Sequence, residues 1–109
     1  MAGAKLILMY PAPKDLAAFE RAYSGEHIPM AASIFQAAGA ARAVLSKVTA
    51  APTGSPAFHR MAEIHFPSMA VLQACAASKG GQDALAHAHR ISNGGAPVIL
   101  IAEEDVVSF

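Results

Sequence analysis

The stretch KLILMYPAP (residues 5–13) decides the fold class of this chain. Successive side chains of a strand point to opposite faces, so Leu6 and Leu8 share one face while Ile7 and Met9 share the other. Both faces are therefore apolar, which is typical of a strand that is covered on both sides. The two prolines that follow are expected to end the strand.

Apolar periodicity and turn residues divide the rest of the chain into strands and helices. The expected elements are a strand over 5–10, helical pieces over 15–38, strands over 41–49 and 58–66, helices from 68 to 91 interrupted at KGG (79–81), and a strand over 97–102. The order βαββαβ predicts an α+β fold of the ferredoxin-like type, in which two helical segments cover one face of a four-stranded antiparallel sheet. The polar strand 41–49 is expected at an edge of that sheet. We expect residues 1–109 to form one domain.

One face of the predicted sheet has no helix to cover it. Strands 5–10 and 97–102 are apolar on both faces, yet the two helical segments cover only one of them. The economical cover for the second face is the same face of a second copy of the chain. The sequence therefore predicts a homodimer with two packed sheets, a dimeric α+β barrel.

Composition excludes several classes of partner. Lys and Arg together number 8, equal to Asp and Glu, so no basic surplus is available for nucleic acid. The apolar run near the N-terminus is too short to span a membrane and lacks the features of a signal peptide. Cys75 is the only cysteine, which excludes an internal disulfide and favours a reducing compartment. We expect a cytoplasmic protein that binds neither nucleic acid nor membranes.

A histidine lies at an expected break in the first helical region, within YSGEHIPMA (residues 23–31). Gly25 weakens the helix, and Pro29 disfavours helical geometry at the residue before it, so we expect a break or kink over residues 24–28. An apolar stripe at helical spacing precedes this break. His27 continues its spacing, four residues after the last member, so we expect its side chain to face the core. The stripe consists of Leu16, Phe19 and Tyr23. Two interpretations of His27 remain open: an acid–base or ligand-binding group in a pocket, or a packed side chain that ties down the broken backbone.

The strand FHRMAEIHF (residues 58–66) places His59, Glu63 and His65 on one predicted face. Two ligands of one metal are conceivable at this spacing, but a site needs three or four converging ligands, so we predict no metal. The buried carboxylate of Glu63 is expected to pair with a cation across the sheet or from a partner chain. The candidate cations are Arg42, Lys47 and Arg60.

Motifs over nearly the whole chain resemble those of the ethyl tert-butyl ether degradation family, EthD. They are a strand ending in Tyr-Pro, an aromatic pair at helical spacing, His-x-Pro, and Ala-Glu followed by Phe. In this sequence they are Tyr10-Pro11, Phe19, Tyr23, His27 with Pro29, Ala62-Glu63 and Phe66. Relatives often carry two adjacent tyrosines where this chain has Ala22-Tyr23.

The resemblance implies a dimeric α+β barrel, in agreement with the fold reached from the strand pattern. That superfamily includes small monooxygenases, isomerases, decarboxylase-like proteins and haem-binding members, and the founding family is associated with ether degradation beside a cytochrome P450 system. Because one fold hosts many functions, the resemblance implies a set of candidate activities, not one reaction.

We expect a pocket for a small hydrophobic compound between the helices and the sheet, working without a cofactor. His27 would move a proton in the pocket and Tyr23 would orient or donate to the ligand. The expected binding residues are Tyr10, Phe19, Met30, Glu63, Ile64 and Phe66, with Leu8 as a further apolar wall. The expected chemistry is proton transfer, isomerisation or oxygenation.

Two alternatives remain. In the first, the chain is a non-catalytic carrier or binding partner of an oxygenase and uses the same pocket. In the second, it binds haem through His27, His87 or His89. His87 and His89 are two positions apart on a predicted helix, so we expect them to point in different directions, one buried and one solvated.

Overall fold

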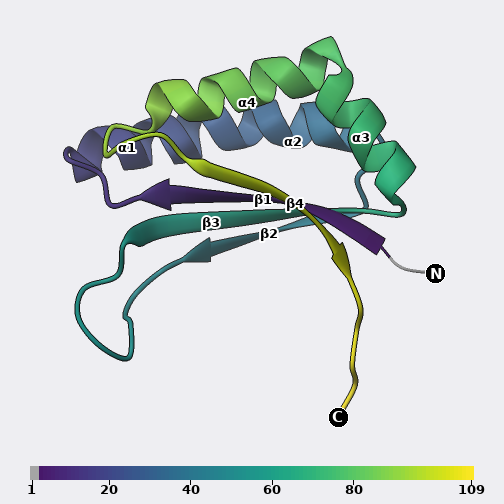
Figure 1. The fold of residues 1–109 in the computed structure, drawn as a ribbon. Coiled ribbons are helices and arrows are strands. Elements are labelled where there is room, and N and C mark those ends of the chain that lie inside the picture. The colour runs from purple at the N-terminus through teal and green to yellow at the C-terminus, as the bar shows by residue number, and fades with distance from the viewer. Residues whose placement is uncertain (1–2) are drawn as a thin grey trace.

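The computed structural model describes residues 3–109 as a four-stranded antiparallel sheet with its helices on one side (Figure 1). The strands are β1 (Gly3–Pro11), β2 (Arg42–Lys47), β3 (Phe58–Phe66) and β4 (Val98–Glu104), in the order β2-β3-β1-β4. This order confirms the predicted ferredoxin-like fold. It also confirms that β2, the most polar strand, lies at an edge.

The central strand β1 sets which side chains face the helices. Leu6, Leu8 and Tyr10 are buried, and they alternate with half-buried residues that point to the other face. Leu8 lies opposite Ala62 of β3 and Ile99 of β4, so the same register carries the core across the sheet. The core therefore forms a layer between the sheet and the helices.

The first helical region continues through the expected break. Helix α1 (Leu16–Ala22) runs into a π-helical turn, η1 (Tyr23–His27), and then into α2 (Ile28–Ala37). The irregularity expected over residues 24–28 is a π turn and not a break, because the wider turn keeps the backbone bonded: the N–H of Ile28 reaches the carbonyl of Tyr23, five residues back. Pro29, which has no N–H, falls where π bonding changes to α bonding, so the helix loses a bond without ending.

Leu16 does not belong to the buried stripe that the sequence suggested. Its side chain is 54% exposed, since α1 begins there, beyond the edge of the core. The two aromatic members of that stripe, Phe19 and Tyr23, are buried as expected.

The second helical region consists of α3 (Met69–Ala77) and α4 (Lys79–Ile91). The expected interruption is present but lies at Ser78, one residue before KGG, where the extended backbone ends α3 and the Ser78 hydroxyl caps α4. Gly80 and Gly81 lie inside the first turn of α4. Gly81 is required there, since a Cβ atom at this position would collide with the carbonyl group of Cys75.

No helix covers the second face of the sheet within residues 3–109 (Figure 1). Its apolar side chains come from all four strands and include Ile7, Met9, Val44, Met61, Val98 and Leu100. A charged cluster lies beside them, in which Lys5 contacts Glu63 at 3.3 Å and Glu104 at 3.8 Å. His65 joins the cluster through a 3.0 Å contact from its Nδ1 to Glu104.

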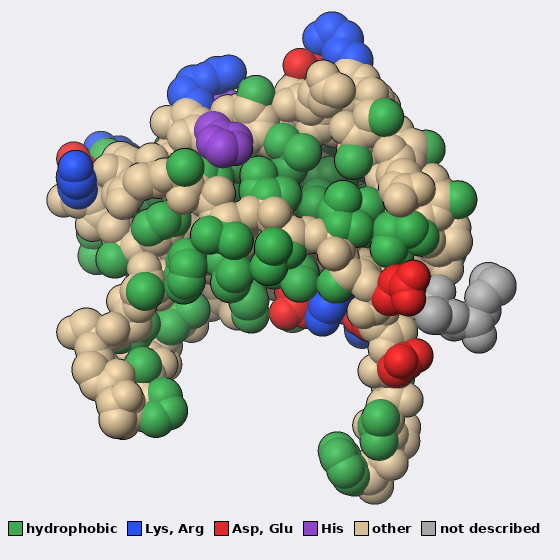
Figure 2. Space-filling view, in the orientation of Figure 1, with side chains coloured by type: hydrophobic (Ala, Val, Ile, Leu, Met, Phe, Trp, Pro, Cys, Tyr) green, Lys and Arg blue, Asp and Glu red, His purple; other side chains and the backbone are tan. Residues whose placement is uncertain are grey.

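Two segments extend from the sheet on the side away from the helices (Figures 1 and 2). One is the loop between β2 and β3, and the other is the stretch after β4, residues 105–109. Val106, Val107 and Phe109 are among the most exposed apolar residues. Figure 2 also shows apolar side chains gathered above these two segments, and the exposed residues of β4 include Leu100 and Ile101.

Candidate functional site

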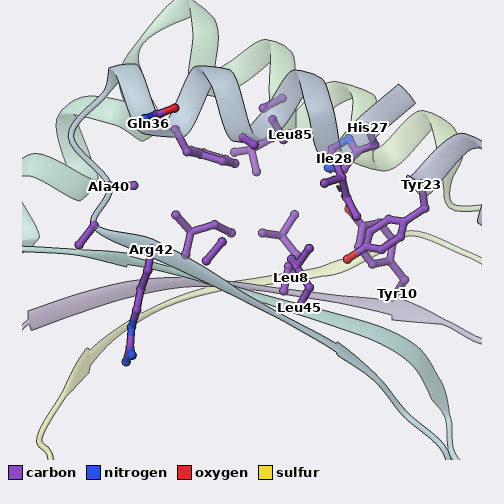
Figure 3. Close-up of a pocket in the computed structure, with 18 residues that line it drawn as sticks. Leu8, Tyr10, Tyr23, His27, Ile28, Gln36, Ala40, Arg42, Leu45 and Leu85 are labelled. Atoms are coloured by element: carbon purple, nitrogen blue, oxygen red, sulfur yellow. Dashed lines mark hydrogen bonds between the residues drawn. The ribbon is translucent and has the colours of Figure 1, made fainter. Parts of the chain in front are cut away.

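A cavity of about 330 Å³ lies between α2, α4 and the sheet (Figure 3). Its walls are largely aliphatic, with Leu8 and Ile64 from the central strands, Leu45 from β2 and Leu85 from α4. One end is polar, where three side chains carry the hydrogen-bonding groups. They are Tyr10, Tyr23 and His27, while the polar lining residues Gln36 and Arg42 lie toward the other end (Figure 3). An apolar pocket with a few polar groups at one end is the usual form of a small-molecule site.

The π turn places Tyr23 and His27 on the same side of the helix. Their rings stack with centroids 6.1 Å apart and planes 17° apart. The Tyr23 hydroxyl is buried and has no hydrogen-bond partner among residues 3–109. Figure 3 shows its oxygen pointing toward the cavity. Burial raises the pKa of the Tyr23 hydroxyl, so it stays protonated at neutral pH and can donate to a ligand.

Tyr10 reaches His27 from the sheet side. Its hydroxyl lies 3.3 Å from Nε2 of His27, and the two rings meet edge to face. Burial, and then the neighbouring Tyr23, raises the pKa of Tyr10 well above its usual value. Both hydroxyls at the polar end are therefore neutral.

His27 itself is buried, with only 6% of its surface exposed. Burial, and then the neighbouring His87, lowers the pKa of His27 from 6.5 to about 4. The imidazole is therefore neutral at pH 7, and its Nδ1 lies 2.9 Å from Nδ1 of His87. Both of its nitrogens are engaged, one toward Tyr10 and one toward His87.

Sequence reasoning missed His87 as a partner of His27. It lies on α4, three positions after the buried Ala84 and one before the buried Ala88, so helical spacing places it near the inner face. His89 is exposed, which confirms that the two histidines of α4 point in different directions. The contact with His27 joins residues 60 positions apart, and no local pattern predicts it.

An ion pair supports Tyr23 from the side away from the cavity. Arg60 of β3 binds both carboxylate oxygens of Glu20, at 2.7 and 3.2 Å, and its guanidinium lies 5.3 Å from the centre of the Tyr23 ring. The hydrogen bond from Arg60 is the main cause that lowers the pKa of Glu20. This pair holds α1 against β3 and limits the positions open to Tyr23.

The predicted face of His59 is wrong. The register between β1 and β3 shifts after Tyr10, and His59 lies in the irregularity. Its ring packs edge to face against Phe19, with centroids 5.8 Å apart, and its Nε2 lies 3.5 Å from a Glu20 oxygen. His59 is therefore on the helix side, away from Glu63.

Glu63 is not brought to the cavity. Strand alternation puts it on the uncovered face, opposite in direction to its neighbour Ile64, which does line the cavity. Its cation is Lys5, because Arg60 is turned toward Glu20 on the other face. The prediction of Glu63 as a binding residue is therefore wrong for this cavity.

Three other predicted binding residues lie near the cavity without lining it. Phe19 is buried against Tyr10, with ring centroids 5.3 Å apart. Phe66 packs edge to face on Phe35, which is itself a lining residue. Met30 is half-buried at the outer side of the core. They support the walls of the cavity but do not contact its interior.

Two other kinds of feature are absent from the described part of the chain. Between residues 3 and 109, no three His, Cys, Asp or Glu side chains converge in a way that could hold a metal ion. None of the helices in this range is long and apolar enough to cross a membrane.

Residues 12–91 match the EthD domain. The chain belongs to the EthD family. An uncharacterized 11.0 kDa protein from the thcB–thcC intergenic region of Rhodococcus erythropolis is 28% identical over 103 residues, covering 94% of this chain and 97% of that protein. The family resemblance that the motifs suggested is thus confirmed.

Solved structures show the same fold. An EthD family protein of Bacillus halodurans C-125 superposes with a TM-score of 0.85 at 26% identity, covering 96% of this chain and all (100%) of that one. A dimeric ferredoxin-like protein of unknown function from Jannaschia sp. CCS1 superposes with a TM-score of 0.72 at 18% identity, covering 95% and 99%. The likeness to the Jannaschia protein extends to the fold alone.

Proposed function

We propose that this EthD protein binds a small, uncharged and largely apolar organic compound in the cavity between its helices and sheet. The observation that carries the proposal is the Tyr23 hydroxyl, which is buried at the polar end of the cavity without a partner among residues 3–109. Leaving a buried hydroxyl unsatisfied costs roughly 1–3 kcal/mol. A ligand oxygen beside Tyr23 would accept its hydrogen bond and recover that free energy.

The electrostatics of the polar end favour a neutral ligand. Tyr10 and Tyr23 have raised pKa values and His27 has a lowered one, so none of these groups is charged at pH 7. Arg42 contributes to the rim, but its guanidinium extends away from the cavity (Figure 3). An anion at the inner end would lose its hydration without gaining a counter-charge.

The same geometry supports acid–base chemistry at His27. A ligand oxygen at Tyr23 would lie beside the contact of Tyr10 with Nε2 of His27, which at 3.3 Å is long enough to open. The two phenols would then stabilise negative charge on that oxygen, while Nε2 accepts a proton from the ligand. The reaction class is cofactor-free proton transfer, of the kind that isomerisations use.

A ligand screen tests binding. Neutral phenols, naphthols and cyclic ketones are compared with carboxylates of the same carbon skeleton by thermal shift, because a bound ligand raises the melting temperature. Neutral compounds should stabilise the protein and their carboxylate analogues should not. Tyr23→Phe should weaken binding about tenfold or more, consistent with the loss of one buried hydrogen bond. Failure of every neutral compound to shift the melting temperature would contradict the proposal.

The carrier alternative uses the same cavity. A substitution of His27 distinguishes a carrier from an enzyme. His27→Gln keeps a hydrogen-bonding side chain but removes the titrating imidazole. If the protein is an enzyme, the variant should still bind the ligand but lose turnover. If it is a carrier, even the wild-type protein transforms no bound compound. Turnover that survives His27→Gln unchanged would exclude the proposed acid–base role.

The geometry does not favour haem. Both nitrogens of His27 already have partners, and Nδ1 of His87 is one of them. His89 is exposed and is not a lining residue of the cavity. His87 is not a lining residue either, so neither histidine of α4 presents a ring nitrogen to a group bound in the cavity.

We also propose that the chain forms a homodimer through the uncovered face of its sheet. That face carries apolar side chains from four strands, and two segments project on the same side, of which the one after β4 carries the exposed Val106, Val107 and Phe109 (Figure 1). A second copy on this face would cover the strands that the helices leave open.

A further inference from the structure

Two histidines from different helices meet behind the cavity. His27 ends the π turn and is buried, while His87 on α4 is half-buried and is not a lining residue. Their rings are parallel to within 1°, with centroids 5.1 Å apart. Their Nδ1 atoms are 2.9 Å apart, the distance of a hydrogen bond. One Nδ1 therefore carries a proton and the other presents a lone pair.

This contact couples the tautomers of the two rings. When Nδ1 of His27 donates to His87, Nε2 of neutral His27 has a lone pair facing the Tyr10 hydroxyl. When Nδ1 of His87 donates instead, neutral His27 carries its proton on Nε2. His87 thus decides whether the cavity-facing nitrogen of His27 accepts or donates.

Above the lowered pKa of His27, which is about 4, the pair holds at most one proton beyond its neutral state. Two imidazolium rings would place two N–H groups against each other across 2.9 Å. Burial disfavours the charge on His27, and His87 is the more exposed ring of the pair.

The other charged groups on α4 are otherwise engaged or face solvent. Lys79 and Asp83 pair with each other at 2.9 Å, and His89 and Arg90 are exposed. On the neighbouring η1 turn, Glu26 is also exposed. From the sheet, the polar group that meets His27 is the neutral Tyr10 hydroxyl.

We propose that His87 is the positioning residue through which His27 exchanges its proton with solvent. The proposal rests on the proposed role of His27 in the cavity, although the pair itself is measurable without a ligand. When Nε2 of His27 takes a proton from a ligand, the proton on its Nδ1 passes to Nδ1 of His87. His27 remains neutral, and the resulting His87 imidazolium releases the proton on its Nε2 to water.

The experiment follows the ring nitrogens of His27 and His87 by NMR in protein labelled with ¹⁵N-histidine, as pH is lowered. In the wild type, the nitrogens of both rings should shift at one common midpoint, because one proton is shared. His87→Phe keeps an aromatic ring but has no ring nitrogens, and it should remove that step from His27. His87→Asn, whose amide can reach the Nδ1 position, should restore a single fixed tautomer of His27. His89→Asn, an exposed change two positions along the same helix, should leave the wild-type pattern unchanged.

Separate midpoints for His27 and His87 in the wild type would overturn the proposal, as would a His27 titration that is the same in His87→Phe. The wild-type titration decides the matter even if a variant fails to fold. A common midpoint in a protein that binds no neutral compound would support the pair and count against the cavity. If a neutral compound binds but His27 and His87 titrate with separate midpoints, the cavity is supported and the coupled pair is contradicted.

Discussion

The guanidinium of Arg60 binds both oxygens of Glu20 and lies 5.3 Å from the centre of the Tyr23 ring. One side chain of β3 thus joins α1 to the sheet and supports the ring whose hydroxyl points into the cavity. The ion pair between Arg60 and Glu20 is thus connected, through the ring of Tyr23, to the polar end of the cavity.

Replacement of Arg60 by Met keeps much of the stem but removes this ion pair. We expect Arg60→Met to lower the free energy of unfolding by about 1–2 kcal/mol, since the pair is bidentate and partly buried. Urea unfolding measures the change. Lys79→Met is the matched control, because it removes an exposed i,i+4 pair with Asp83 that contributes about 0.3–0.5 kcal/mol. Equal losses in the two variants would show that Arg60 has no special structural role.

The lowered pKa of His27 predicts a stability that falls as pH falls. An unfolded histidine takes up a proton near its usual pKa of 6.5, whereas folded His27 resists protonation until about 4. The unfolded state therefore binds more protons between these values, so the stabilisation is present above 6.5 and is lost on acidification toward 4. Between pH 7 and pH 5 the loss should reach about 2 kcal/mol.

Urea unfolding of wild type and His27→Gln at these two pH values isolates this effect. The variant should lose the pH dependence that belongs to His27. The lowered pKa of Glu20 contributes in a different window, because its stabilisation is lost only as pH falls below its ordinary value of 4.5. A wild type and a variant with the same slope between pH 7 and pH 5 would contradict the assignment to His27.

The uncovered face of the sheet predicts a dimer that one charge disrupts. Leu100 lies on this face, opposite Ile7 of β1, and is 48% exposed in the single chain. Leu100→Glu would bury a carboxylate without a partner at the proposed interface and should shift the protein toward monomer. Light scattering coupled to size exclusion measures the mass. Leu16→Glu is the control, since Leu16 is equally exposed, at 54%, but lies on the helix side. A wild-type protein that is monomeric at every concentration would end the dimer proposal.

Two glycines in helical segments should respond in opposite ways to alanine. Gly81→Ala places a methyl group against the carbonyl group of Cys75, at the close approach of α3 and α4, and should cost more than about 2 kcal/mol. Gly25→Ala meets nothing within 4 Å and should stabilise the helix by about 0.5–1 kcal/mol. Thermal and urea unfolding of the two variants provide the comparison, and a tolerated Gly81→Ala would mean that the two helices can separate.

Local periodicity predicted the strands, the helical regions and most of the faces, with His59 and Leu16 as exceptions. The two-sided apolar strand around Leu6 and Leu8 pointed to the central position of β1, because alternation along a strand depends on geometry that every strand shares. The stripe of Phe19 and Tyr23 likewise turned His27 inward, since helical spacing is preserved closely enough across the π turn. These inferences needed only residues within two or three turns of one another.

The contacts between polar side chains at and around the cavity depend on how elements that are distant in the sequence pack together. The hydrogen bond between His27 and His87, the bulge that turns His59 toward Phe19, and the pairing of Glu63 with Lys5 each join segments far apart in the chain. Sequence alone gives such side chains a face but not a neighbour, because the neighbour follows from the register of strands and the separation of helices. For this chain the sequence determined the sheet, the covered face and the inward histidine. The tertiary structure alone decided that this histidine meets a second one, since only packing brings α4 against the π turn.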